Sequence, residues 1–213
     1  MPASSDTALH ELLQHPAIWR GRSTARGATL STGFPRLDEA LPGGGWPRTG
    51  CIELLTPRWG VGELRLLMPT LAQLSQLVPA RWLAWIAPPF EPYAPALLEQ
   101  GVAIERQLVV RASKPLWAME QALGSGACAA ALAWLPSERS RGLARRLRRL
   151  QLAAERGQGL GFLFCEHASA RESSPAALRL WVEPIEQGVR LRLLKSRGGL
   201  RSPFELRWTD ATQ

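Results

Sequence analysis

The sequence has few of the residues from which metal and redox sites are built. It contains three cysteines and three histidines, and no C-x-x-C pair. Cys51, Cys128 and Cys165 lie far apart, each in an apolar stretch typical of a strand, so we expect buried thiols rather than disulfides. Because thiols and imidazoles do not cluster at metal-ligand spacing, we predict no metal site and no other cofactor.

Long apolar runs are also absent. No stretch approaches the roughly 18 residues of a membrane-spanning helix, and the first residues lack the basic and then apolar pattern of a signal peptide. We therefore expect a soluble, cytoplasmic protein. With 213 residues of which 46% are hydrophobic, the chain is long enough and apolar enough for one well-buried core.

Lysine is scarce, although the protein is basic. Of 26 basic residues only Lys114 and Lys195 are lysine. Residues 1–136 carry 11 basic and 10 acidic side chains, whereas residues 137–213 carry 15 and 8, so the last third holds nearly all of the net charge of +8. Guanidinium groups pair bidentately with phosphate, which favours a polyanionic partner such as DNA. The alternative is a solvated basic face that keeps the protein soluble.

The stretch 51–74, CIELLTPRWGVGELRLLMPTLAQL, reads as strand, tight loop and helix, with the helix opening near Glu63. A phosphate-binding loop would lie at this place, with the pattern G-x-x-x-x-G-K-[ST], whose backbone N–H groups and lysine hold phosphate. Pro69 conflicts with the predicted helix and should kink it or move its start later.

The residues at the defining positions of that loop have lost the required chemistry. Counted on the pattern, the loop residues are Thr56, Gly60, Val61, Gly62 and Glu63. A carboxylate at the helix N-terminus suits the helix dipole but repels the anion that the loop would hold. We therefore predict a degenerate nucleotide loop, no catalytic residues and no enzymatic activity, with Trp46 and Trp59 filling the former pocket.

From residue 51 onward, strand-like and helix-like runs alternate at the spacing of a parallel sheet with crossover helices. Further strands are expected at 81–86, 104–111, 128–134 and 160–165, and helices at 93–100, 113–123 and 137–156. Near the end, 178–185 and 189–195 predict an antiparallel hairpin, with 204–208 as a last edge strand. The fold class is therefore α/β, and we place one domain at residues 28–213.

Residues 137–156 predict a helix with one apolar and one basic face. Leucines 143, 147 and 150 lie on one side, and the arginines Arg141, Arg145, Arg148 and Arg149 lie on the other. One interpretation is a surface for the backbone of single-stranded DNA, extended by Arg171 in the polar loop that follows. The other is the solvent face of a crossover helix, and the sequence leaves both open.

The first 27 residues read as a helical arm followed by a linker. Within TALHELLQHP, Leu9, Leu12 and Leu13 share one side of a short amphipathic helix that ends at Pro16. We predict that these leucines bind a partner or another copy of the chain.

The segments STGFPRLDEALPGGGWPRTGCIELLTP and LLKSRGGLRSPFEL resemble the RecA recombinase family in order and spacing. Together with HPAIWRG and the triple glycine before Trp46, they are similar to the ImuA branch of that family. The resemblance implies a RecA-like core, a mostly parallel twisted sheet flanked by helices, with a C-terminal antiparallel hairpin. It also implies a non-catalytic adaptor in translesion DNA synthesis, a form of DNA repair in the SOS response to DNA damage.

Partners follow from the same resemblance. They are an ImuB-type inactive Y-family polymerase, the RecA recombinase, an error-prone replicative-type polymerase, and single-stranded or damaged DNA. Lys195 and Arg197 match a basic pair that recombinases place near the subunit boundary, which implies partner contacts here.

The resemblance also shows which catalytic parts are missing. Pro89 stands where recombinases have the glutamate that activates water, Trp134 where they have a magnesium-binding aspartate, and His167 where a glutamine senses the terminal phosphate. Phosphoryl transfer depends on such positioning and charge neutralisation, so the resemblance implies a pseudo-ATPase.

A second resemblance stays open. The SulA-type cell-division inhibitors of the SOS response look like trimmed relatives of the same fold, also without a phosphate loop, and they bind the tubulin-like division protein. The basic last third favours the adaptor, because DNA binding requires positive charge and division inhibition does not.

Overall fold

The computed structural model describes residues 29–135, 143–171, 174–196 and 202–211. The predicted arm with Leu9, Leu12 and Leu13 lies outside the described residues, as do Arg141 and Arg197. The division between an arm and a domain at residue 28 therefore stays a prediction.

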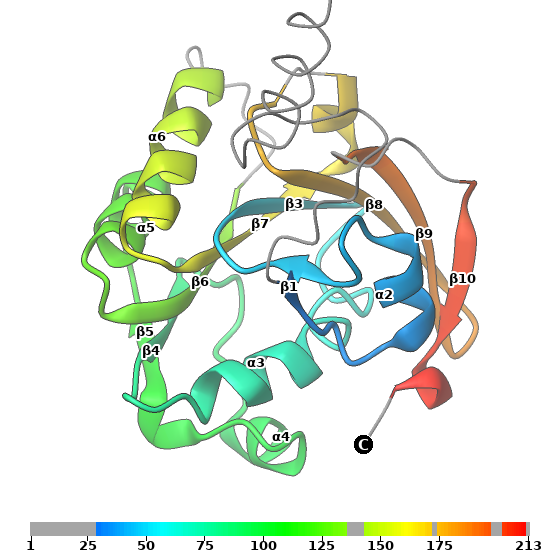
Figure 1. Cartoon of the computed structure of the whole chain (residues 1–213), viewed down its shortest axis with the longest axis horizontal. Coiled ribbons are helices and arrows are strands. Elements are labelled where there is room, and N and C mark those ends of the chain that lie inside the picture. The colour runs from blue at the N-terminus through cyan, green and yellow to red at the C-terminus, as the bar shows by residue number, and fades with distance from the viewer. Residues whose placement is uncertain (1–28, 136–142, 172–173, 197–201, 212–213) are drawn as a thin grey trace, which may run out of the picture.

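An eight-stranded mixed sheet forms the centre of the molecule (Figure 1). Its order is β10-β9-β8-β3-β7-β6-β4-β5. The strands are β3 (Gly50–Thr56), β4 (Trp82–Ile86), β5 (Gln107–Val110), β6 (Cys128–Trp134), β7 (Leu160–Glu166), β8 (Leu178–Ile185), β9 (Gly188–Lys195) and β10 (Phe204–Arg207). A separate small ribbon pairs β1 (Thr29–Leu30) with β2 (Trp46–Pro47).

The six strands from β8 to β5 run parallel, while β9 is antiparallel to both β8 and β10. The hairpin predicted at 178–195 is thus present, and β10 extends it to three antiparallel strands. β3 and β6 are buried at every position, because helices cover the central strands on both faces.

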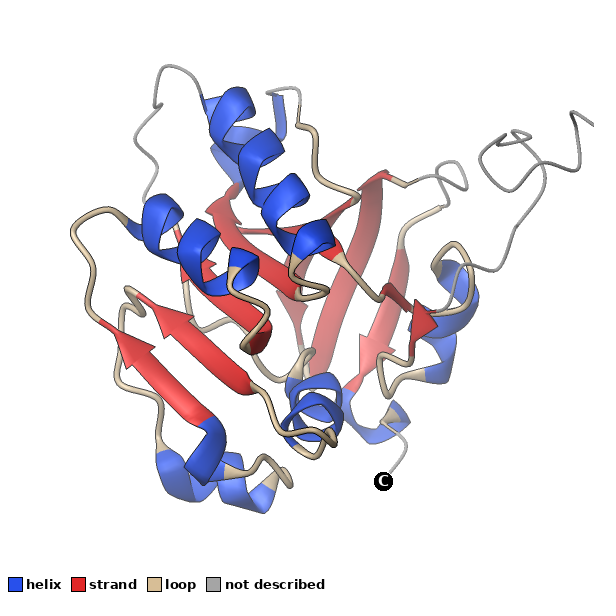
Figure 2. Ribbon diagram, turned by 60° about the vertical axis from the view of Figure 1, so that its left-hand side comes forward, coloured by secondary structure: helices blue, strands red, loops and turns tan. Residues whose placement is uncertain are grey.

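Helices lie on both sides of the sheet (Figure 2). On one face α5 (Pro115–Gly124) and α6 (Leu143–Arg156) pack against each other and on Cys51, Leu55 and Ile86. On the other face lie α2 (Pro35–Ala40), α3 (Met68–Ser75) and α4 (Ala94–Glu99), over a core that includes Ile52, Leu54 and Trp85. Alternate residues of each strand therefore enter different cores.

Two local predictions differ from the structure. The helix expected to open near Glu63 begins at Met68, because Pro69 is tolerated only in the first turn of a helix. The strand expected from residue 104 begins at Gln107, after the 3-10 turn η1 (Ile104–Arg106). The three cysteines are buried free thiols, which confirms that prediction.

The remaining short elements are η2 (His167–Arg171) after β7 and η3 (Trp208–Asp210) after β10. Among the described residues no helix is long and apolar enough to cross a membrane.

Candidate functional site

The loop between β3 and α3 binds a carboxylate of its own. The Glu63 side chain is buried, and its two oxygens accept hydrogen bonds from the backbone N–H groups of Gly60, at 2.7 Å, and Val61, at 2.8 Å. A phosphate-binding loop offers such N–H groups to phosphate oxygens. Here the donors are already satisfied by an internal anion, which leaves them no capacity for another.

The rest of the loop is held by close packing. A side chain at Gly62, whose φ is +104°, would approach the Trp208 ring at 2.6 Å, so only glycine fits. The guanidinium of Arg65 lies over the same ring, 5.1 Å from its centroid. Thr56 at the end of β3 is fully buried, and its hydroxyl makes no hydrogen bond among the described residues.

An apolar groove of about 600 Å³ opens beside this loop, at the carboxyl ends of β4 and β6. Its floor contains the buried rings of Trp85 and Trp134, which stack with centroids 6.1 Å apart. Its rim contains Phe90 and Tyr93, which are 74% and 70% exposed. Exposed aromatic side chains beside an apolar hollow are a surface that another molecule can cover.

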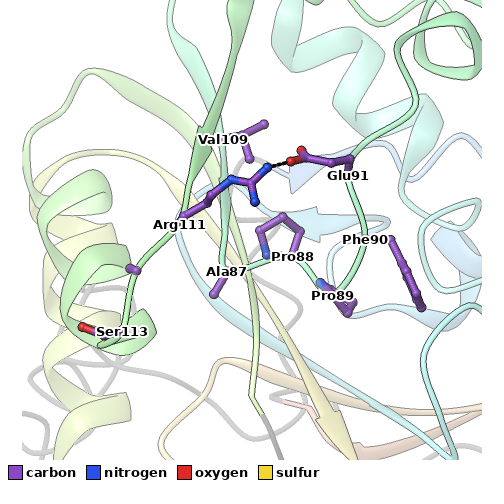
Figure 3. A pocket seen from close by; sticks show the side chains of 9 residues that line it. Ala87, Pro88, Pro89, Phe90, Glu91, Val109, Arg111 and Ser113 are labelled. Atoms are coloured by element: carbon purple, nitrogen blue, oxygen red, sulfur yellow. Dashed lines mark ion pairs between the residues drawn. The ribbon is translucent and has the colours of Figure 1, made fainter.

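A second hollow of about 510 Å³ lies between residues 87–91 and the residues at the end of β5 (Figure 3). Phe90 lines both hollows. Figure 3 shows Arg111 reaching from the end of β5 to Glu91, with which it forms an ion pair. This pair is exposed, so it orients the two side chains more than it stabilises the fold.

The residues predicted for the degenerate loop are thus brought together, and two of the replaced catalytic positions, Pro89 and Trp134, line the neighbouring groove. Trp59 lines the groove as well, whereas Trp46 is buried elsewhere and donates its indole N–H to Thr70. Among the described residues, no group of three His, Cys, Asp or Glu side chains lies close enough to hold a metal ion.

The predicted arginine surface lies away from this groove. α6 packs on the opposite face of the sheet, where Arg145 and Arg148 are exposed. Arg149 forms an ion pair with Glu120 of α5 at 2.9 Å, so part of that charge is neutralised within the protein. Arg171 ends η2, and Lys195 donates to the backbone oxygen of Ser174.

His167 and Trp181 form a stack that the sequence did not reveal. The two ring centroids lie 3.5 Å apart, and the guanidinium of Arg192 lies over the Trp181 ring, 4.8 Å from its centroid. The Cys165 thiol, two residues before His167 in the sequence, is buried in the sheet, so it is not placed to act as a nucleophile.

Sequence reasoning also missed two buried polar clusters. Glu53 pairs with Arg179 at 2.5 Å and accepts a hydrogen bond from Ser174, which secures the segment after η2. Arg81 donates to four backbone oxygens, those of Gly126, Cys128, Gly157 and Gln158. The only signal was a charged residue within an apolar run, for Glu53, or just before one, for Arg81.

These features define an α/β protein with a mixed sheet, a self-capped loop and an apolar groove. Comparison with known proteins indicates which family of α/β proteins this chain resembles. Residues 60–161 match the family model described as Cell division inhibitor SulA.

Curated relatives carry the same description. The protein of Photorhabdus laumondii is 31% identical over 118 residues, which cover 54% of this chain and 63% of the relative. The protein of Edwardsiella piscicida is 38% identical over 101 residues, which cover 46% and 56%. The chain therefore spans 56 to 63% of the length of these two relatives.

Among solved structures, that of SulA from Pseudomonas aeruginosa is 30% identical. The overlap covers 54% of this chain and 97% of that chain, with a TM-score of 0.42.

The family model and the relatives point to the SulA cell division inhibitors, which corrects the interpretation as an ImuA protein. The predicted adaptor function in translesion synthesis is wrong as well. So are its predicted partners, which were the ImuB-type protein, the recombinase, the error-prone polymerase and DNA. The RecA-like fold class is also wrong. The error arose because short segments shared in order and spacing were taken as specific, and because a basic surface does not identify its partner.

Proposed function

We propose that this protein is a SulA-like, non-catalytic inhibitor of cell division that acts in the cytoplasm by binding the tubulin-like division protein. One observation carries the proposal. The stretch that matches the SulA family model, residues 60–161, supplies every lining residue of the apolar groove except Trp59. The part of the chain that resembles a known inhibitor is therefore also the part with the most exposed aromatic surface.

The groove suits a protein partner better than a nucleotide. The backbone donors beside it already bind the Glu63 carboxylate, and Glu99 adds a negative charge to a lining that also contains Arg65 and the ion-paired Glu91. Phe90 and Tyr93 offer large apolar areas that gain free energy when a partner removes them from water. The inhibitor would act by holding the division protein rather than by altering it chemically.

The first experiment is expression of the chain in a bacterium with a matching division protein. We expect filamentous cells, and purified protein should bind the purified division protein directly. The variant Phe90→Asp with Tyr93→Asp should weaken binding at least about tenfold, because it places two charges on the exposed part of the groove.

Leu152→Asp is the matched control. Leu152 is 55% exposed on α6, on the opposite face of the sheet, so this change adds charge without touching the groove. It should leave binding unchanged. Cells that express the chain and divide at normal length, together with no binding of the purified division protein, would overturn the proposal. An equal loss of binding in both variants would show that the groove is not the binding surface.

A further inference from the structure

The charges that line the apolar groove are opposite in sign to the charge of the whole chain. The chain has a net charge of +8. The groove nevertheless contains three glutamates, Glu63, Glu91 and Glu99, and a single basic residue, Arg65. A hollow with charges of one sign and apolar walls strengthens the local field and attracts ions of the opposite sign. The groove therefore favours a positively charged group.

The charged residues of the lining differ in how far they are already engaged. The guanidinium of Arg65 lies over the ring of Trp208, which does not line the groove. Arg111 reaches Glu91 from the second hollow and pairs with it (Figure 3). Glu99 is exposed at the end of α4 and forms no ion pair with any residue that the structure describes. Glu99 is therefore the carboxylate that a ligand can pair with directly.

Aromatic rings accompany this carboxylate. Phe90 and Tyr93 are exposed at the rim, and the partly buried Trp59 lines the same groove. The face of an aromatic ring is the negative end of its quadrupole, so it attracts a cation as well as apolar groups. Tyr93 directly precedes α4 and Glu99 ends it, so one short helix places a ring and a carboxylate in the groove. Rings that surround a cation in this way recognise ammonium groups in other proteins.

We propose that the groove is an aromatic site for a positively charged group, and that in the complex with the division protein it receives an arginine or lysine side chain of that partner. The inference rests on the proposed function, because it names the chemistry that the groove recognises. The alkyl part of such a side chain would contact the aromatic rings, and its charge would pair with Glu99.

The size of the groove suits such a side chain. Its volume of about 600 Å³ lies within the range of roughly 300 to 1,000 Å³ that is usual for ligand pockets. Because Phe90 and Tyr93 are exposed, a side chain can reach them without displacing other parts of the protein. An anionic partner would be repelled by the glutamates of the lining.

A small probe tests the site without the division protein. Choline carries a trimethylammonium group, and dimethylbutanol is the uncharged analogue in which carbon replaces the nitrogen. The NMR signal of the Trp59 indole N–H, identified by its loss in Trp59→Phe, reports binding at constant ionic strength. Over about 1 to 200 mM ligand, choline should bind at least about fivefold more tightly than the alcohol.

Variants separate the charge from the rings. Glu99→Gln should abolish the preference for choline, whereas Glu105→Gln removes the same charge from η1, outside the groove, and should keep it. Tyr93→Leu retains much of the apolar area but loses the ring face, so it should weaken choline binding more than alcohol binding. Phe90→Asp with Tyr93→Asp loses both rings and should bind choline more weakly than the wild type.

The division protein provides the second test. Choline should weaken its binding more than the alcohol does, and more than sodium chloride at the same ionic strength. Glu99→Lys should raise the dissociation constant of the complex at least about tenfold, because it places a cation where the partner's cation binds. Glu105→Lys changes the net charge equally and should leave the dissociation constant within about twofold of the wild type.

Equal binding of choline and the alcohol, or a full preference for choline in Glu99→Gln, would overturn the inference even if the division protein binds. Choline that binds without competing with the division protein would also overturn it, because the partner's side chain would then lie elsewhere. Failure of the proposed function looks different. The division protein would not bind the wild type, while choline would still bind the groove in preference to the alcohol.

Discussion

Glu63 shows how one side chain changes the use of a loop. A carboxylate at this position was expected only to repel an anion. In the structure it takes the place of an anion, since its oxygens accept hydrogen bonds from the two backbone N–H groups that could otherwise donate to a phosphate. Hydrogen bonds to a carboxylate are stronger than those between neutral groups, and this one is buried. The loop is therefore ordered without a ligand.

Glu63→Ala should destabilise the protein by about 1 to 3 kcal/mol, because the N–H groups of Gly60 and Val61, of which the second is buried, lose their acceptor. Inorganic phosphate should then raise the melting temperature of the variant but not that of the wild type, since only the variant has free donors. Thermal unfolding in phosphate and in chloride buffer measures both effects. A wild-type chain that phosphate stabilises equally would contradict this account of the loop.

At the scale of elements, Arg81 joins the amino ends of three strands. Its guanidinium, just before β4, bonds to Gly126 and Cys128 before and in β6, and to Gly157 and Gln158 before β7. The end of α5 and the turn after α6 also lie so close together that a Cβ atom added at Gly157 would be 1.9 Å from the backbone oxygen of Leu123. Neighbouring parallel strands are not joined by a short turn that would align their ends. The hydrogen bonds of Arg81 hold these ends together instead.

Arg81→Met should lower the free energy of unfolding by about 3 kcal/mol, because three part-buried carbonyl groups and one exposed carbonyl group lose a charged donor. Arg81→Lys should recover only part of this, since a single ammonium lacks the planar fork. Urea denaturation measures the change. Arg111→Met is the control, because Arg111 is largely exposed, and its effect should stay within about 0.5 kcal/mol. Equal effects of both methionine variants would contradict the role of Arg81.

At the scale of the whole molecule, buried thiols couple stability to pH. Burial, with smaller contributions from the charges of Glu53 and Glu155, raises the pKa of Cys51 from 9.0 to about 12. Below pH 9 the thiol is protonated in both the folded and the unfolded chain. Above it only the unfolded chain loses the proton, so the unfolded state is favoured as the pH rises.

The free energy of unfolding should therefore fall between pH 9 and about 12, by up to about 1.4 kcal/mol per pH unit for this thiol. Cys51→Ala should show a smaller slope there and the wild-type slope at neutral pH. Denaturant titrations across that range provide the measurement. An identical slope in wild type and variant above pH 9 would show that Cys51 does not contribute.

Much of the secondary structure follows from local pattern. The apolar run 128–134 and the first strand of the predicted hairpin, 178–185, become β6 and β8 with the expected bounds, because runs rich in apolar residues favour buried strands. The residues from Thr56 to Glu63 lie at the end of β3 and in the loop before α3, and their interpretation as a degenerate nucleotide loop stays a prediction. The resemblance to the SulA inhibitors, which the comparisons favour, was ranked second, because short shared segments do not distinguish related branches.

The sequence by itself determined the α/β class and the buried cysteines, since each depends on residue type and spacing along the chain. Only the tertiary structure decided that Glu63 satisfies its own loop, that Arg81 joins two distant loops, and that Phe90 and Tyr93 remain exposed beside buried tryptophans. These contacts connect residues whose partners are chosen by packing in three dimensions, and no local pattern encodes such a choice.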